Sequence, residues 1–354
     1  MSSAPPINVA LLHVQVRHPM GQQRYEREID LALRALDSPS LRAISMSVSG
    51  LRSDLKSDMK IPMGLSMEVP LRAQRAYLGL RLRRFDLVHR MDLRLPSAPV
   101  EVVTVHDVAP LRYPDEGSLP KHAAQSLRRA RAIIAPSSFA ADDIADALSV
   151  ERPVVIYNGV PTDTFSAEPL APSTLVKMGI HGPFILHCGG VSQRKNLRGL
   201  HAAWGMLSQT DPDLLLVLAG AADPRRSELF EGDERVVLTD HLERESLLGL
   251  MKSATVVIVP SLYEGFGFPA VEAMACGTAV VASRTASLPE ICGDAALLCD
   301  PEAEAMADAL HTVCSDSNLR EALIVAGNDR AKVFTWKAAA EKHLAIYRQV
   351  TEHG

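Results

Sequence analysis

Short apolar runs alternate with longer segments of helical periodicity along the whole chain. In the first half these runs predict strands at Ile7–Val14, Leu41–Val48, Asp86–His89, Val100–Val105, Ala132–Ala135 and Val154–Ile156. In the second half they predict strands at Phe184–Cys188, Leu214–Ala219, Val236–Leu238, Thr255–Val259 and Ala279–Ala282. Strands that are apolar on both faces and separated by helices are typical of parallel sheets covered by helices.

Segments with helical spacing of apolar residues fill the intervals between the strands. The predicted helices are Gln23–Leu36, Leu71–Arg84, Pro120–Ala130, Ala140–Leu148, Asn196–Gln209, Arg244–Ser253, Pro269–Ala275, Pro301–Cys314, Leu319–Phe334 and Trp336–Val350. A polar, proline-containing stretch at Pro161–Ser173 interrupts the alternation. The sequence therefore predicts two α/β domains, residues 1–165 and 170–335, that face each other across a cleft at the carboxyl ends of their strands.

Composition agrees with two ordinary globular domains. The chain has 354 residues, of which 47% are hydrophobic and 22% charged, and its formal net charge is -5. That charge argues against a nucleic-acid partner. The five cysteines form no C-x-x-C pair, which favours reduced core cysteines over disulfides or a zinc site. The first apolar run predicts a strand, not a signal peptide, and no run approaches 18 residues, so a cytoplasmic location is expected.

The densest chemical signal is the segment Val259–Ser283. Glu264, Gly265 and Gly267 lie in a predicted loop, and Pro269 begins the helix that carries Glu272. Free amides at the start of this helix favour an anion such as a diphosphate, and both carboxylates can accept hydrogen bonds from sugar hydroxyls. Alternatively, Glu272 only complements the helix dipole, worth ~0.3–1 kcal/mol, and the glycines only form a turn.

Two further positions carry candidate chemistry at strand ends. Arg194 and Lys195 follow a strand and the pair Gly189–Gly190, so they can neutralise a diphosphate leaving group or form a solvated basic pair. His106 follows another strand and is a candidate for a hydrogen bond to the sugar. Its neighbour Asp107 can orient the imidazole ring or cap a turn.

Five segments together resemble a known family. The run EGFGFPAVEAMACGTAVVAS contains Glu264 and Glu272 in an E-x7-E spacing and closely resembles family 4 retaining glycosyltransferases of the GT-B fold. The resemblance extends over nearly the whole chain through FILHCGGVSQRKNL, VTVHDVAPLRYP, VVIYNGVPTDTF and FTWKAAAEKHLAIYRQV. The third of these departs from the family, because Thr162 replaces the usual aspartate of its NGVD segment.

The resemblance implies roles for individual residues. Glu272 would bind the ribose and Glu264 would support the donor sugar. Arg194 and Lys195 would neutralise the leaving diphosphate, and His106 would contact the transferring sugar. The implied donor-binding set also contains Gly21, Gly190, His241, Leu242, Gly265, Phe266, Gly267 and Phe268. Gln22, Arg24 and Asp107 are candidates for the acceptor side. The final helix, residues 336–354, would pack back onto the first domain.

These observations predict a metal-independent hexosyltransferase without a cofactor that retains the anomeric configuration. The resemblance favours mannose or a related deoxysugar from a GDP-sugar, transferred to a glycan or lipid-linked acceptor in bacterial surface polysaccharide synthesis. A UDP-sugar donor, an epimerase or hydrolase, and a non-catalytic partner subunit remain alternatives. Asp211–Asp213 resembles a metal motif of another glycosyltransferase fold, but its position before a strand indicates a turn.

The predicted helix Leu71–Arg84 is strongly basic. It carries Arg72, Arg75, Arg81, Arg83 and Arg84 beside apolar positions Leu71, Tyr77, Leu78 and Leu82. Such a helix can lie on an anionic membrane, which would place the protein at the inner face of the cytoplasmic membrane. A solvated basic face on a packed helix is the alternative.

Overall fold

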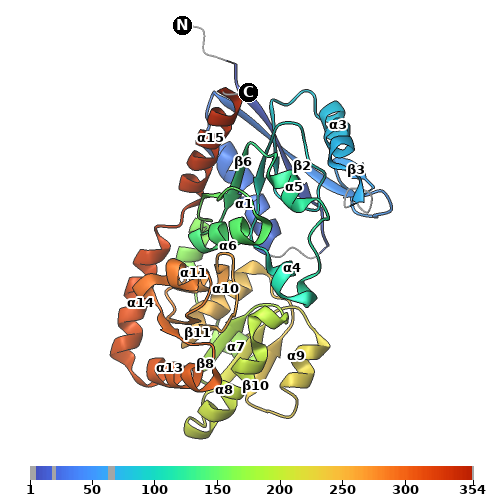
Figure 1. The fold of residues 1–354 in the computed structure, drawn as a ribbon. Coiled ribbons are helices and arrows are strands. Elements are labelled where there is room, and N and C mark those ends of the chain that lie inside the picture. Colours follow the sequence, from blue (N-terminus) through green and yellow to red (C-terminus); the bar gives the residue numbers. More distant parts are fainter. Residues whose placement is uncertain (1–4, 18–20, 63–67, 353–354) are drawn as a thin grey trace. The chain divides into compact units, whose positions relative to one another are not determined.

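The protein divides into two compact units, which are described separately below. The computed structural model describes residues 5–17, 21–62 and 68–352. Unit 1 comprises the chain up to Gly159 together with the residues from Thr335 onward, and unit 2 is Val160–Phe334. The observed division thus falls before the predicted boundary at 165–170, and the last helix belongs to unit 1 (Figure 1).

Unit 1 is built on a seven-stranded sheet. Its strands are β1 (Ile7–Val14), β2 (Leu41–Gly50), β3 (Met59–Ile61), β4 (Leu87–Arg90), β5 (Glu101–Thr104), β6 (Ala132–Ala135) and β7 (Val154–Val155). They are arranged in the order β3-β2-β1-β4-β5-β6-β7, and every neighbouring pair is parallel. Val9, Ala10, Leu11 and Leu12 are fully buried in β1, as expected of a strand with a helix layer on each face.

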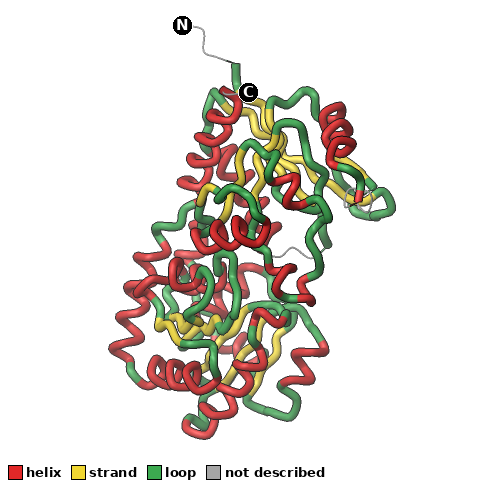
Figure 2. The backbone as a smooth tube through the Cα atoms, viewed as in Figure 1, coloured by secondary structure: helices red, strands yellow, loops and turns green. Residues whose placement is uncertain are grey.

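The helices of unit 1 are α1 (Gly21–Ala35), α3 (Leu71–Arg81), α4 (Ala109–Arg112), the 3-10 turn η1 (Pro114–Glu116), α5 (Ala123–Leu127), α6 (Ser138–Leu148) and α15 (Trp336–Glu352). Helix α15, red in Figure 1, packs against α1 and therefore joins the amino-terminal unit despite following unit 2 in the chain. Figure 2 shows strands enclosed by helices in each unit.

Unit 2 is built on a six-stranded parallel sheet. Its strands are β8 (Phe184–Cys188), β9 (Leu215–Ala219), β10 (Val236–Thr239), β11 (Val256–Val259), β12 (Val280–Ser283) and β13 (Leu297–Cys299), in the order β10-β9-β8-β11-β12-β13. The strand order reverses between β8 and β11, which are hydrogen-bonded neighbours. This is the topological switch point at which open α/β sheets bind ligands.

Helices flank this second sheet. They are η2 (Thr162–Ser166), α7 (Pro172–Lys177), η3 (Gln193–Lys195), α8 (Leu197–Thr210), α9 (Pro224–Leu229), α10 (Arg244–Ser253), α11 (Phe268–Ala275), α12 (Leu288–Cys292), η4 (Gly293–Ala295), α13 (Ala303–Ser315) and α14 (Ser317–Ala331). One core cluster joins β8, β9, β11 and β12 to α8 and α13 and includes Trp204, which is 2% exposed. The predicted fold class is therefore confirmed: the chain is α/β with two parallel sheets.

Several predicted elements needed correction. Strands β3 and β13 were missed because three residues carry no detectable periodicity. Helix α7 lies partly in the stretch assigned to a linker. The basic helix ends at Arg81 instead of Arg84, and Tyr77, expected on the apolar side, is 37% exposed. Of the predicted helix Pro120–Ala130, only Ala123–Leu127 is helical.

Candidate functional site

Two loops meet at the switch point of unit 2. The loop after β8 carries Arg194 and Lys195, and the loop after β11 carries Glu264. Backbone and side-chain bonds join them: Leu262 N donates to Arg194 O at 2.7 Å, and Arg194 Nη1 donates to Tyr263 O at 3.3 Å. Residues that the sequence separates by about 70 positions are thus held together at the carboxyl ends of adjacent strands.

Glu264 is the centre of this junction. Its Oε1 accepts from Lys195 Nζ at 2.6 Å and from Ser261 Oγ at 2.7 Å, while its Oε2 accepts from Arg194 Nη1 at 3.2 Å. Burial alone would raise the pKa of this carboxyl, but Lys195 and Arg194 outweigh burial and lower it to about 2. Lys195 and Arg194 thus place two cationic side chains around one buried carboxylate.

The loop that carries Glu264 is fixed from a third strand. Ser287 Oγ donates to Glu264 O at 2.9 Å, and Thr285 Oγ1 donates to Ser261 O at 2.7 Å, both from the segment after β12. Gly267 begins α11 with φ 98°, and a Cβ at this position would lie 2.9 Å from Leu288 Cδ2. Only glycine satisfies both the backbone angle and the space.

Glu272 lies on α11 and is 6% exposed. Its Oε1 accepts from Arg244 Nη1 at 3.2 Å, and the same guanidinium donates to Thr164 Oγ1 at 2.7 Å and to both carboxylate oxygens of Asp163 at 3.1 and 3.2 Å. The aspartate position of the NGVD segment is occupied by Pro161, and not by Thr162 as the sequence interpretation had it. Asp163, two residues after Pro161, supplies a carboxylate to Arg244 of α10, and the same guanidinium bonds Glu272.

The glycines after β8 differ in their surroundings. A Cβ on Gly190 would meet no heavy atom within 4 Å, so this predicted donor contact borders open space. A Cβ on Gly189 would lie 3.2 Å from His187 Nε2 and 3.8 Å from Lys195 Cδ. His187 Nδ1 lies 3.3 Å from Ile258 O, and burial lowers the pKa of this histidine to about 4.

In unit 1, His106 follows β5 and its Nε2 is buried with no hydrogen-bond partner among the described residues. Burial lowers its pKa to about 4, opposed by the charge of Asp92. Asp107 Oδ1 accepts from Ala109 N at 3.0 Å, so of its two predicted roles the structure shows the turn cap. Gln22 Nε2 donates to Met91 O at 3.2 Å.

Beside Gln22 lies a buried carboxyl that the sequence did not reveal. Glu26 is 3% exposed, and its Oε1 accepts from Gln22 Nε2 at 3.1 Å. Burial and the nearby Asp92 raise the pKa of Glu26 to about 8, so the group is neutral at pH 7. An uncharged acid beside the predicted acceptor residues can both donate and accept a hydrogen bond.

A buried hydrogen-bond chain ties α15 to the strands beneath His106. Its five contacts measure 2.7–2.9 Å and join, in order, Tyr347 Oη, His89, Thr104 Oγ1, Tyr25 Oη, His343 and Ala339 O. The five side chains are at most 2% exposed. The His106 ring meets the Tyr25 ring edge-on, with centroids 4.7 Å apart.

The direction of every bond in this chain follows from its last acceptor. Ala339 O can only accept, so His343 Nδ1 carries a proton; since burial keeps the His343 ring neutral, its Nε2 accepts from Tyr25. Tyr25 must then accept from Thr104, Thr104 from His89 Nε2, and His89 Nδ1 from Tyr347. With both histidines neutral, five protons fill the five contacts. This agrees with burial, which lowers the pKa of His343 to about 4 and that of His89 well below its ordinary value.

The remaining predicted residues lie apart from these clusters. His241 is exposed in the segment between β10 and α10, and Leu242 is half-buried. Asp240 does not cap α10, whose N-cap residue is Glu243. Phe266 packs edge-on against Phe268 and Phe334 at 5.3 and 5.5 Å, so its side chain is part of the core.

Two more predicted residues lie on α1. Gly21 is its exposed first residue, and the preceding residues 18–20 of the predicted loop lie outside the described residues. Arg24 is half-buried in the first turn.

Gly265, in the loop after β11, is buried.

Sequence reasoning missed residues that matter to the geometry. Ser261, Ser287 and Arg244 bond to predicted site residues, and Asp163 bonds Arg244. Only Ser261 had a local signal, because it lies three residues before Glu264. The others come from distant segments.

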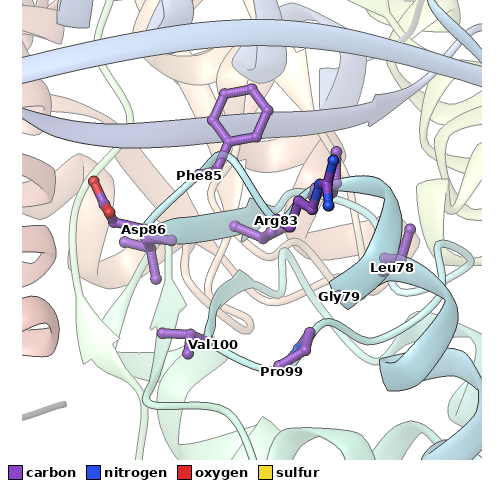
Figure 3. Close-up of a pocket in the computed structure, with 10 residues that line it drawn as sticks. Leu78, Gly79, Arg83, Phe85, Asp86, Pro99 and Val100 are labelled. Carbon is purple, nitrogen blue, oxygen red and sulfur yellow. The ribbon is translucent and has the colours of Figure 1, made fainter.

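The cavity shown in Figure 3 lies elsewhere in unit 1. It has a volume of about 150 Å³, and its walls include Leu78, Gly79, Asp86, Pro99 and Val100. Asp86 and Val100 precede β4 and β5, so this cavity borders the amino ends of the strands. The predicted site residues follow the carboxyl ends, and none of them is among the residues that line this cavity.

Comparison with known proteins identifies the family. Residues 59–164 match the family model described as Glycosyltransferase Family 4, and residues 180–330 match that of Glycosyl transferases group 1. Alpha-maltose-1-phosphate synthase of Mycolicibacterium smegmatis is 30% identical over 94% of this chain and 90% of its own length. The chain belongs to glycosyltransferase family 4.

Two further similarities agree with membership of family 4. The O-antigen chain mannosyltransferase B of Escherichia coli is 28% identical over 75% of this chain and 72% of its own length. The solved structure of sucrose-phosphate synthase from Thermosynechococcus elongatus superposes with a TM-score of 0.75 at 24% identity, covering 98% of this chain and all of that one. The family 4 chain therefore has the GT-B fold.

Two negative observations concern the described residues alone. None of their helices has the length and apolar content needed to cross a bilayer. Within residues 5–17, 21–62 and 68–352, no three His, Cys, Asp or Glu side chains cluster as metal ligands would.

The buried histidines of this family 4 enzyme predict loss of stability in mild acid. In the folded state the pKa of His343 is about 4, below its ordinary 6.5. The unfolded chain therefore binds a proton at this histidine near pH 6.5, whereas the folded chain does not. The stability present above pH 6.5 is consequently lost as the pH falls towards 4. At pH 5 this amounts to about 2 kcal/mol for this one histidine.

Thermal unfolding at pH 7 and pH 5 measures this effect. The midpoint should fall for the native protein and fall less for His343→Asn, which is less stable at pH 7 because Tyr25 loses its acceptor. Glu26 acts in the opposite direction, since its raised pKa stabilises the fold as the pH falls below 8. An equal drop in the native protein and in His343→Asn would contradict a neutral His343.

Proposed function

We propose that this enzyme transfers a hexose from a nucleoside-diphosphate sugar with retention of the anomeric configuration. The observation that carries the proposal is the junction of Glu264, Lys195 and Arg194 at the switch point of unit 2. The two cationic side chains there are of the kind that bind a diphosphate, and the low pKa of Glu264 keeps its buried carboxylate ionised at neutral pH. Glycosyltransfer itself follows from family membership.

The chemistry follows from the charge that develops during transfer. As the bond between the anomeric carbon and the diphosphate oxygen breaks, negative charge grows on the diphosphate beside Lys195 and Arg194. Preorganised cations stabilise this charge more in the transition state than in the ground state. The acceptor hydroxyl attacks from the face that the diphosphate leaves, and its proton passes to a diphosphate oxygen. Because the two cations supply positive charge, we propose that no metal ion is required.

The donor and acceptor are proposed from similarity. The Escherichia coli relative is a mannosyltransferase of the O-antigen chain, which favours mannose or a related deoxysugar, and we propose a GDP-sugar as donor. The acceptor would be a glycan or a lipid-linked oligosaccharide in bacterial surface polysaccharide synthesis. A UDP-sugar is the alternative donor.

Donor consumption tests the function directly. GDP- and UDP-sugars are incubated with the purified protein, with and without glycan and lipid-linked acceptors and with excess EDTA. A transferase releases nucleoside diphosphate only with an acceptor, and release should survive EDTA. Acceptor-independent turnover would indicate an epimerase or hydrolase, and no turnover with any pair would indicate a non-catalytic subunit. NMR of the product's anomeric proton reports retention or inversion.

The basic helix α3 is proposed to touch an anionic membrane at the inner face of the cytoplasmic membrane. Arg72, Arg81, Arg83 and Arg84 are exposed in and directly after this helix, and Leu80 between them is 74% exposed. Exposed cations around a projecting leucine suit a lipid headgroup surface.

Replacing Arg81, Arg83 and Arg84 with Gln should reduce cosedimentation with anionic liposomes, because each basic residue contributes roughly 1 kcal/mol near such a surface. Neutral liposomes provide the control for the native protein. Equal sedimentation of the native and triple-variant proteins with anionic liposomes would show that α3 presents a solvated basic face that does not bind the membrane.

A further inference from the structure

Arg226 on α9 is a buried guanidinium that forms no salt bridge with any of the described residues. The residue is 2% exposed, and its Nη2 donates to Gly189 O at 2.6 Å. Its Nε and Nη1 are buried and have no hydrogen-bond partner among the described residues. Asp223, a carboxylate close by, is held instead by Nε and Nη2 of Arg225 at 3.0 and 2.9 Å.

The position of Arg226 links it to the loop after β8. Gly220 follows β9, and a Cβ there would lie 2.6 Å from Gly189 O and 2.8 Å from Arg226 Nη2. The glycine therefore makes room for the contact between the arginine and Gly189. On its other side Gly189 borders His187 and Lys195, as described above. One glycine thus separates Arg226 from the cationic junction.

Arg226 adds a cation to a region that already holds two. Lys195 and Arg194 share the carboxylate of Glu264, whereas Arg226 forms no salt bridge among the described residues and two of its nitrogens have no hydrogen-bond acceptor there. His187 adds none, because its Nδ1 must donate to Ile258 O and burial keeps the ring neutral. A buried charge without a partner is strongly unfavourable unless it serves a bound counter-ion.

We propose that Arg226 is a further anion-binding residue of the donor site, which attracts the diphosphate through its buried charge and holds the Gly189 carbonyl. This inference rests on the proposed function, since a nucleoside-diphosphate sugar supplies the negative charge that the buried, unpaired guanidinium of Arg226 lacks. Arg226 acts through the electrostatic field of its charge and by holding the backbone at Gly189–Gly190. It is therefore a positioning residue and not a catalytic one.

Calorimetry with GDP, UDP and the nucleosides guanosine and uridine tests the proposal. Arg226→Met should weaken binding of the preferred nucleoside diphosphate by about 10- to 100-fold, and leave binding of the free nucleoside unchanged. Arg226→Lys retains the charge and should lose less than about 10-fold. The matched control is Arg225→Gln on the same helix, an exposed arginine paired with Asp223, which should bind like the native protein.

Thermal unfolding without ligand separates binding from a structural role. Removing an uncompensated charge should leave the midpoint of Arg226→Met equal to that of the native protein or above it, while the rise caused by saturating diphosphate shrinks. A lower midpoint of Arg226→Met with native diphosphate affinity in that variant overturns the inference, as does equal weakening of nucleoside and diphosphate. If Arg226→Met fails to fold, a loss of more than about 10-fold in Arg226→Lys overturns it. If the native protein binds neither GDP nor UDP, the proposed function itself fails.

Discussion

Replacing Lys195 with alanine is expected to lower the transfer rate about 100-fold. Lys195 Nζ lies 2.6 Å from Glu264 Oε1, and its side chain is 12% exposed, so the charge is fixed in place before a donor arrives. A preorganised charge-assisted donor contributes on the order of 3 kcal/mol to stabilisation of a departing anion. Binding of the donor itself should weaken much less, because the negative charge grows only as the diphosphate leaves.

Single-turnover rates and donor affinities measured on the same preparation distinguish these effects. Lys177→Ala, which removes an exposed lysine of α7, is the control and should behave like the native enzyme. A Lys195→Ala variant with a normal rate and only weaker donor binding would show that the lysine stabilises the bound donor in the ground state and adds nothing in the transition state.

Substitutions of the two glutamates in the E-x7-E spacing are expected to have different effects on the transfer rate and on nucleotide binding. Glu264→Gln should lower the transfer rate about 100-fold, because the carboxylate positions both Lys195 and Arg194. Binding of the free nucleoside diphosphate should be unchanged or tighter, since the substitution removes a negative charge from the cationic junction.

Glu272→Gln should instead weaken donor and free nucleoside diphosphate alike, by about 10-fold, because ribose hydroxyls do not change during the reaction. Arg244 would retain Asp163 and Thr164 as partners, so the fold should survive. For both variants, calorimetry measures the affinity for the nucleoside diphosphate and steady-state kinetics measures the transfer rate. If both bind and turn over like the native enzyme, the two carboxylates are structural.

The predicted site residues are easiest to place from the sequence where they follow strands. A strand of apolar residues ends visibly in the sequence, and residues just after it lie at the edge of the sheet where ligands bind. Arg194, Lys195, Glu264 and His106 all satisfy this condition, and the structure joins the first three in one cluster. Their roles in binding and catalysis stay predictions. Arg226 was not foreseen, because its six-residue helix leaves no periodic signal.

The sequence by itself determined the alternation of buried strands and helices, and with it the fold class. Runs such as Ile7–Val14 and Phe184–Cys188 coincide with β1 and β8 to the residue, because a strand buried on both faces must be apolar throughout. The E-x7-E segment likewise indicated the family, since its glycines and carboxylates are close in the chain.

Only the tertiary structure decided which polar groups are partners. Lys195 and Glu264 are 69 residues apart, and Tyr25 and His343 are 318 apart, yet each pair is bonded. These contacts depend on the order of the strands and on the return of α15 to unit 1, and neither is encoded in a local pattern. The charge of Glu264 and the neutrality of His343 follow from those contacts, because burial and neighbouring charges set a pKa and both arise only in the folded chain.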